Sequence, residues 1–135
     1  MSRENVEVIR RLFDAFNRRD TARAQELWVT DGEFRPAYTG GGLVEGAVYR
    51  GHEGLAEYIA LQADTWESMV AIPVELRDLG NRVLVEVRLE SVGRGSGVPL
   101  DGRTWNVFEL HDGRVVDGRV YITKEDALEA VELRD

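Results

Sequence analysis

The chain has 135 residues, a formal net charge of −8 at pH 7 and no cysteine. This length suits one domain, residues 1–135, and is short for two. The acidic balance argues against nucleic-acid and membrane-surface partners, because both present negative charge. The missing cysteines, with no apolar run of membrane-spanning length and no apolar leader, fit a protein kept in a reducing cytoplasm.

The histidines give no sign of a metal site. His52 and His111 lie far apart in unrelated contexts and share no ligand spacing. His52 precedes a predicted helix, and His111 ends a predicted strand beside a turn, so neither has a nucleophile to activate. We therefore expect neither a metal nor a cofactor.

The first predicted element is an amphipathic helix over residues 5–16. Its apolar residues recur at helical spacing: Val6, Ile9, Leu12, Phe13 and Phe16. Asp20 can cap a second, short helix over residues 21–28, which would bury Leu27 and Trp28.

A short strand is predicted at residues 32–36, GEFRP. Side chains alternate along a strand, so Glu33 and Arg35 share one face and Phe34 takes the other. Either the charged pair points inward and forms a polar pocket, or Phe34 points inward and the pair is solvated surface.

After this strand the sequence predicts a loop, a helix and then four strands. The glycine-rich segment 39–46 predicts a loop, and residues 49–66 return to helical periodicity. From residue 70 the apolar period changes to two, which predicts strands over residues 70–76, 82–92, 104–111 and 114–122. Pro73 favours an edge strand or a bulge, and Asp112-Gly113 favours a tight hairpin.

The chain ends in a predicted helix over residues 124–133, for which Thr123 and Asp126 resemble a capping box. Residues 93–97, GRGSG, have glycine at every second position, as some phosphate-binding loops do. They join two predicted antiparallel strands, however, and no helix begins after them. They therefore predict a hairpin loop and not a phosphate cradle. Helices followed by a run of antiparallel strands indicate an α+β fold.

Three segments carry a resemblance to a known family: RRLFDAFNRRDTARAQELWVTDGEF, YRGHEGLAEYI and NVFELHDGRVVDGRVYITKEDALEAV. Together they resemble the SnoaL-like branch of the nuclear-transport-factor-two-like superfamily, which includes polyketide cyclases and relatives of ketosteroid isomerase and limonene epoxide hydrolase. The resemblance implies a cone, or cystatin-like α+β roll, in which a strongly bent, mainly antiparallel sheet wraps around the helices and encloses an apolar pocket. Because this fold serves several chemistries, function depends on the pocket residues.

Ketosteroid isomerases of this kind use a tyrosine, a basic aspartate and a protonated aspartate. The resemblance places Leu12, Arg35 and Asn106 at these positions. Arginine cannot accept a proton at neutral pH and leucine cannot donate one, so isomerase activity of that type is rejected. Asn106 keeps a hydrogen-bond donor.

Limonene epoxide hydrolase uses an arginine and an aspartate two residues apart, plus a second aspartate. Arg88 and Glu90 match the first two, but Val120 stands at the third position. The acid that would protonate the epoxide oxygen is therefore missing. A full copy of that mechanism is not expected.

The predicted site combines these positions. We expect Arg35, Arg88, Glu90 and Asn106 to converge on the pocket floor, where an arginine would select an oxygen-rich ligand. The candidate catalytic residues are Arg88, Glu90 and Arg35, and the candidate ligand-binding residues are Phe16, Trp28, Glu33, Tyr58, Trp66, Asn106 and Phe108. The alternatives are that the charged stripe is a solvated face and that the helical aromatic residues belong to the core.

Two function classes remain open. One is a cofactor-independent acid–base enzyme, such as an isomerase, cyclase, dehydratase or hydrolase, acting on an apolar, oxygen-bearing metabolite. The other is a non-catalytic binding or accessory protein with the same pocket. In both, a small molecule is the ligand. We further expect a homodimer across the outer sheet through residues such as Val83, Val85, Val87, Trp105 and Val107.

Overall fold

The computed structural model describes residues 2–36, 38–39, 42–43, 48–93 and 99–132. The helices are α1 (Ser2–Asn17), α2 (Thr21–Glu26), α3 (Gly51–Thr65) and α4 (Lys124–Ala130). The strands are β1 (Trp28–Arg35), β2 (Tyr38–Thr39), β3 (Gly42–Leu43), β4 (Tyr49–Arg50), β5 (Trp66–Asp78), β6 (Arg82–Gly93), β7 (Pro99–His111) and β8 (Arg114–Tyr121). Within these residues, no helix is long and apolar enough to cross a membrane.

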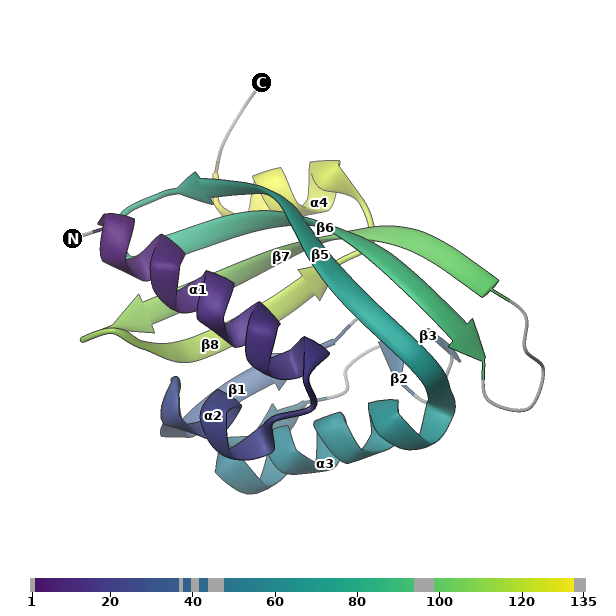
Figure 1. The fold of residues 1–135 in the computed structure, drawn as a ribbon. Coiled ribbons are helices and arrows are strands. Elements are labelled where there is room, and N and C mark those ends of the chain that lie inside the picture. The colour runs from purple at the N-terminus through teal and green to yellow at the C-terminus, as the bar shows by residue number, and fades with distance from the viewer. Residues whose placement is uncertain (1, 37, 40–41, 44–47, 94–98, 133–135) are drawn as a thin grey trace.

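One bent sheet organises the molecule. Its six strands lie in the order β4-β1-β8-β7-β6-β5, and β1 and β8 form the parallel pair among otherwise antiparallel neighbours. Figure 1 shows the long strands arching over α1 and α3, while α4 lies on the opposite side of the sheet. We call the side facing α1 and α3 the inner face, and the other side the outer face. The predicted α+β cone is confirmed.

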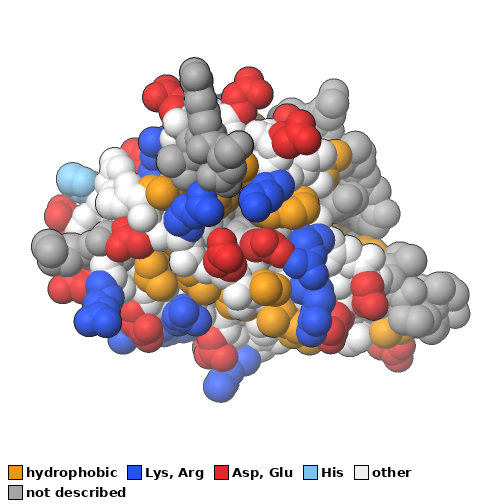
Figure 2. All heavy atoms as spheres, turned by 90° about the horizontal axis from the view of Figure 1, so that it is seen from above, with side chains coloured by type: hydrophobic (Ala, Val, Ile, Leu, Met, Phe, Trp, Pro, Cys, Tyr) orange, Lys and Arg blue, Asp and Glu red, His pale blue; other side chains and the backbone are white. Residues whose placement is uncertain are grey.

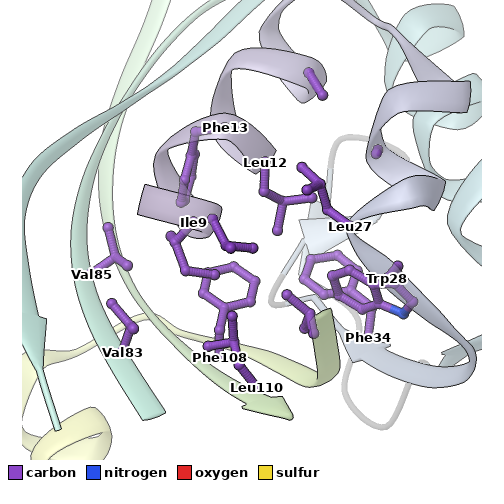
Figure 3. Packing of buried hydrophobic residues seen from close by; sticks show 14 of the residues in the cluster. Ile9, Leu12, Phe13, Leu27, Trp28, Phe34, Val83, Val85, Phe108 and Leu110 are labelled. Carbon is purple, nitrogen blue, oxygen red and sulfur yellow. The ribbon is translucent and has the colours of Figure 1, made fainter. Parts of the chain in front are cut away.

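The main core fills the inner face beneath α1. Ile9 and Leu12 of the predicted helical stripe are fully buried, and Phe13 packs edge-on against Phe108 with ring centroids 6.0 Å apart. Figure 3 shows these side chains meeting others from β1, β6 and β7, namely Trp28, Phe34, Val83, Val85 and Leu110. Apolar periodicity in the sequence therefore located the core correctly for α1.

The tight hairpin between β7 and β8 is also confirmed. Asp112 and Gly113 have φ angles of 51° and 77°. Positive φ at both central residues matches the right-handed twist of the flanking strands, which is why Asp-Gly suits this turn.

Other predictions need correction. Trp28 begins β1 and does not end a helix, because α2 stops at Glu26 and Leu27 forms its C-cap. Part of the predicted loop at 39–46 forms the short ladder of β2 with β3. Of the predicted hairpin loop at 93–97, only Gly93 falls among the described residues, as the last residue of β6.

The residues expected at a dimer interface divide between the two faces. Val83, Val85 and Val87 are buried in the inner core and are therefore unavailable to a partner, contrary to the prediction. Trp105 and Val107 do lie on the outer face, where they belong to a second apolar cluster with Leu84 and with Ala127 and Val131 at α4. The terminal helix thus covers part of the surface that was expected to be open.

Candidate functional site

The inner face encloses a cavity of about 290 Å³ between the sheet, α1 and α3. Its helical wall consists of Phe13, Phe16, Asn17, Tyr58, Ile59 and Gln62. Its strand wall consists mainly of Phe34, Trp66, Met69, Ala71, Val87, Leu89, Ser91, Gly102, Thr104, Asn106, Phe108 and Val120. Arg19, Pro36, Asp101 and Arg103 complete the lining.

Aromatic rings surround Tyr58 on α3. Its ring centroid lies 4.8 Å from that of Phe34, 5.4 Å from that of Tyr49 and 6.5 Å from that of Phe16, in each case near edge-to-face. Burial, with a smaller contribution from Tyr49, raises the pKa of Tyr58 well above its ordinary value. The hydroxyl is therefore protonated at physiological pH, and no hydrogen bond to it is found within the described residues.

Two amide side chains bring further polar groups to the cavity wall. The Gln62 Oε1 atom accepts a 3.1 Å hydrogen bond from the Trp66 indole Nε1. The Asn106 Oδ1 atom accepts a 3.2 Å hydrogen bond from the Thr104 hydroxyl. Both amide oxygens are used within the protein, whereas the NH₂ groups have no protein partner in the described chain.

A third amide, that of Asn17, has a structural role. Its Oδ1 accepts from the Ala71 backbone N–H at 2.8 Å, and its Nδ2 donates to the Ala71 carbonyl at 2.9 Å. Strand β5 is an edge of the sheet, so this pair of bonds satisfies backbone groups that would otherwise lack a strand partner. Asn17 thereby fastens the end of α1 to the wall of the cavity.

Gly102 opens the strand wall. Its Cα partner on β6 is Leu89, which lines the cavity, so position 102 belongs to the inner face. A Cβ built at Gly102 would meet no atom within 4 Å. The neighbouring side chains belong to the outer face, because Asp101 lies opposite Glu90 and Arg103 pairs with Glu86. The missing side chain at Gly102 therefore enlarges the space that a ligand can occupy.

Five of the predicted ligand-binding residues do line this cavity: Phe16, Tyr58, Trp66, Asn106 and Phe108. Trp28 does not. It is 1% exposed and packs edge-on against Phe34 at 6.0 Å, which makes it a core residue, as the alternative interpretation held.

The pair Glu33 and Arg35 lies on the outer face, contrary to the prediction. Phe34 between them is buried and lines the cavity, so alternation turns both charged side chains away. Arg35 donates to Glu33 Oε1 at 2.7 Å and to Asp117 Oδ1 at 3.0 Å, and Arg50 donates to the other oxygen of Glu33 at 3.0 Å. These four residues form a charged network across β4, β1 and β8.

Arg88 and Glu90 are also misplaced in the prediction. Their side chains are each 49% exposed and form a 3.0 Å ion pair with each other. Val87 and Leu89, which alternate with them, line the cavity instead. The catalytic candidates Arg35, Arg88 and Glu90 therefore do not converge with Asn106. Burial of the alternating aliphatic side chains stabilises the fold, whereas burial of the charged side chains would cost free energy.

The sequence did contain a signal for some residues that the prediction missed. Asn17 follows Phe13 by four positions, and Gln62 follows Tyr58 by four, so each shares a helix face with a cavity residue. An uncharged amide on an otherwise apolar helix face marks a buried polar contact or a ligand site. Gly102 had no such signal, because its face depends on the pairing register of β6 and β7.

Comparisons with known proteins agree with this architecture. A family model described as a SnoaL-like domain matches residues 9–118, whereas no curated protein matches the chain. A nuclear-transport-factor-two-like protein of unknown function from Burkholderia pseudomallei is 18% identical, with a TM-score of 0.77 over 93% of this chain and 95% of that chain. A protein with a ketosteroid isomerase-like fold from Catenulispora acidiphila, in complex with trimethylamine, is 16% identical, with a TM-score of 0.76 over 95% of this chain and 94% of that chain.

A third similar structure is a proposed SnoaL-like polyketide cyclase from a Jannaschia species. It is 19% identical, with a TM-score of 0.76 over 98% of this chain and 94% of that chain. Structural similarity at such low sequence identity shows a common fold and does not show a common function. The family model covers most of the sequence, from α1 into β8. The chain belongs to the SnoaL-like domain family.

Proposed function

We propose that this protein binds an apolar, oxygen-bearing small molecule in the inner-face cavity and does not transform it by acid–base chemistry. The residues proposed to contact the ligand are Phe16, Tyr58, Trp66, Asn106 and Phe108. A volume of about 290 Å³ is at the lower end for ligand pockets, which favours a compact molecule. Mostly aromatic and aliphatic walls with a few polar groups are typical of such sites.

The observation that carries this proposal is the position of the acidic groups. Among the described lining residues there is no histidine, and Asp101 is the one with a carboxyl group. Its Cα partner Glu90 is on the outer face, so the Asp101 side chain points the same way, away from the ligand space. A general base must lie within hydrogen-bond reach of the proton it removes, and the described interior offers none.

The test uses 2-tetralone, a compact bicyclic ketone whose α-protons exchange through the enol. Calorimetry should detect saturable binding at neutral pH. In D₂O, nuclear magnetic resonance should show α-proton exchange no faster than in free solution at matched concentration. Absence of saturable binding would reject the proposal. If the protein accelerates α-proton exchange, and the rate saturates at the same ligand concentrations as the calorimetric binding curve, the acid–base enzyme is supported instead.

Replacing Arg35 with Leu should affect stability and leave 2-tetralone binding unchanged. Arg35 bridges Glu33 and Asp117, so its loss leaves these neighbouring carboxylates facing each other, with Arg50 still paired on the other side of Glu33. We expect the free energy of unfolding to fall by about 1–2 kcal/mol in urea titrations, since the network is only partly screened from water.

The matched control for Arg35 is Arg88→Leu, which removes the more exposed ion pair with Glu90. It should cost less than about 1 kcal/mol. Weaker tetralone binding by folded Arg35→Leu protein, with Arg88→Leu unchanged, would contradict the outer-face position of Arg35.

We also propose that two copies of the chain pair through the outer face. Val70 and Val74 on edge strand β5 are 41% and 52% exposed, and Figure 2 shows apolar patches between charged side chains on this side. The nearby pairs Arg88–Glu90 and Arg103–Glu86 present both guanidinium and carboxylate groups on this face, so a two-fold arrangement can place the arginines of one copy against carboxylates of the other.

Sedimentation at micromolar concentration should therefore show a dimer. Val70→Glu should shift the protein towards monomer, because four carboxylates would then crowd the interface from the two copies of positions 70 and 90, which are cross-strand partners. A monomeric wild-type protein would exclude this pairing.

A further inference from the structure

The polar groups that face the cavity are mostly hydrogen-bond donors. The Trp66 indole nitrogen can only donate, so its 3.1 Å bond requires the Gln62 amide to turn its oxygen towards Trp66. The Gln62 NH₂ group is then left for the ligand space. The Thr104 hydroxyl donates its only proton to Asn106 Oδ1, which leaves the Asn106 NH₂ group in the same position.

Tyr58 adds a third donor. Its hydroxyl keeps its proton, because burial in the aromatic wall disfavours the phenolate. No side chain or backbone group in the described chain accepts that proton. Arg19 at the rim of the cavity also only donates, and one of its bonds goes to the Trp66 carbonyl at 3.2 Å.

We propose that the cavity selects ligands that carry hydrogen-bond acceptors, such as ketones, quinones or lactones, over ligands of equal shape that carry donors. This inference rests on the proposed binding function and adds the chemical class of the ligand. A ligand that covers one of these donors without accepting a hydrogen bond from it removes the donor from water without compensation. A ligand that supplies only another donor is therefore disfavoured.

Three nearly isosteric tricyclic molecules separate these possibilities: fluorene is apolar, 9-fluorenone adds one carbonyl acceptor, and carbazole adds one N–H donor. Binding is measured by displacement of 2-tetralone and by calorimetry. Fluorenone should bind about three- to tenfold more tightly than fluorene, as one neutral hydrogen bond would give. Carbazole should bind no better than fluorene.

Two variants locate the effect. Tyr58→Phe and Asn106→Leu each remove one donor with little change of shape, and at least one of them should bring the affinity for fluorenone down to that for fluorene. The control is Tyr49→Phe, which removes a hydroxyl from the ring beside Tyr58 but outside the cavity lining. It should leave the preference intact.

The outcomes are distinct. If all three molecules bind equally, or carbazole binds best, the acceptor preference is wrong while the binding function stands. If fluorenone is preferred and neither variant alters the preference, the Gln62 NH₂ group is the donor that remains. An unchanged preference in Gln62→Leu as well would overturn the inference. If none of the three binds and 2-tetralone does not bind either, the proposed function fails and the acceptor preference with it.

Discussion

Gly102→Phe should strongly weaken the binding of 2-tetralone while the protein remains folded. A side chain at this position enters open space, since an added Cβ meets no atom within 4 Å. A phenyl group projecting from the inner face would occupy a large part of the roughly 290 Å³ available to a ligand. We therefore expect affinity to fall at least about tenfold, with little loss of stability because the ring fills an existing cavity.

The matched control for Gly102→Phe is Asp101→Phe, one residue earlier on the same strand. That substitution adds the same ring to the outer face, opposite Glu90. Its ligand affinity should equal that of the wild type. Comparable loss of binding in both variants would show that the ligand site is not the inner-face cavity, and normal binding in both would show that position 102 does not border the ligand.

The faces of the strands explain which site predictions succeeded. Along β1, the sequence allowed either Phe34 or the pair Glu33 and Arg35 to point inward, and resemblance to enzymes of the superfamily favoured the arginine. Burial of a phenylalanine is worth about 2 kcal/mol, whereas burial of an arginine costs free energy unless every donor is matched. The simple rule that apolar residues point inward was the better guide.

The same reasoning applies to β6. Val85, Val87 and Leu89 alternate with Glu86, Arg88 and Glu90, and this pattern alone predicted that Arg88 and Glu90 are solvated. The opposite assignment required these valines to lie at an outer-face interface, whereas they are buried in the inner core. Leu84 and Val107 are covered by Ala127 and Val131, so part of the apolar surface on the outer face is already buried within one chain.

Other features could not be predicted from local pattern. The donors in the cavity depend on contacts between side chains, such as Trp66 with Gln62, that fix which atom of an amide is left free. Gly102 lies on the inner face because of the pairing register of β6 with β7, and this register is set by contacts between distant parts of the chain. By contrast, Asp112-Gly113 encodes its turn locally, and α1 encodes its buried stripe through helical periodicity.

Trp28→Ala should destabilise the fold more than Arg35→Leu or Gly102→Phe does. The Trp28 side chain is 1% exposed, and two glycines make room for it: a Cβ at Gly32 would lie 2.5 Å from the Trp28 Nε1, and one at Gly118 would lie 3.0 Å from Cη2. Because the fit is so close, removal of the indole leaves a cavity that the neighbouring side chains cannot fill. The free energy of unfolding in urea should therefore fall by about 3–5 kcal/mol.

Trp105→Ala, which removes a half-buried indole from the outer face, is the control and should lower the free energy of unfolding by less than half as much. Equal losses would contradict the assignment of Trp28 to the core, and Trp28→Phe, which keeps an aromatic ring, provides a milder variant if the alanine protein does not fold.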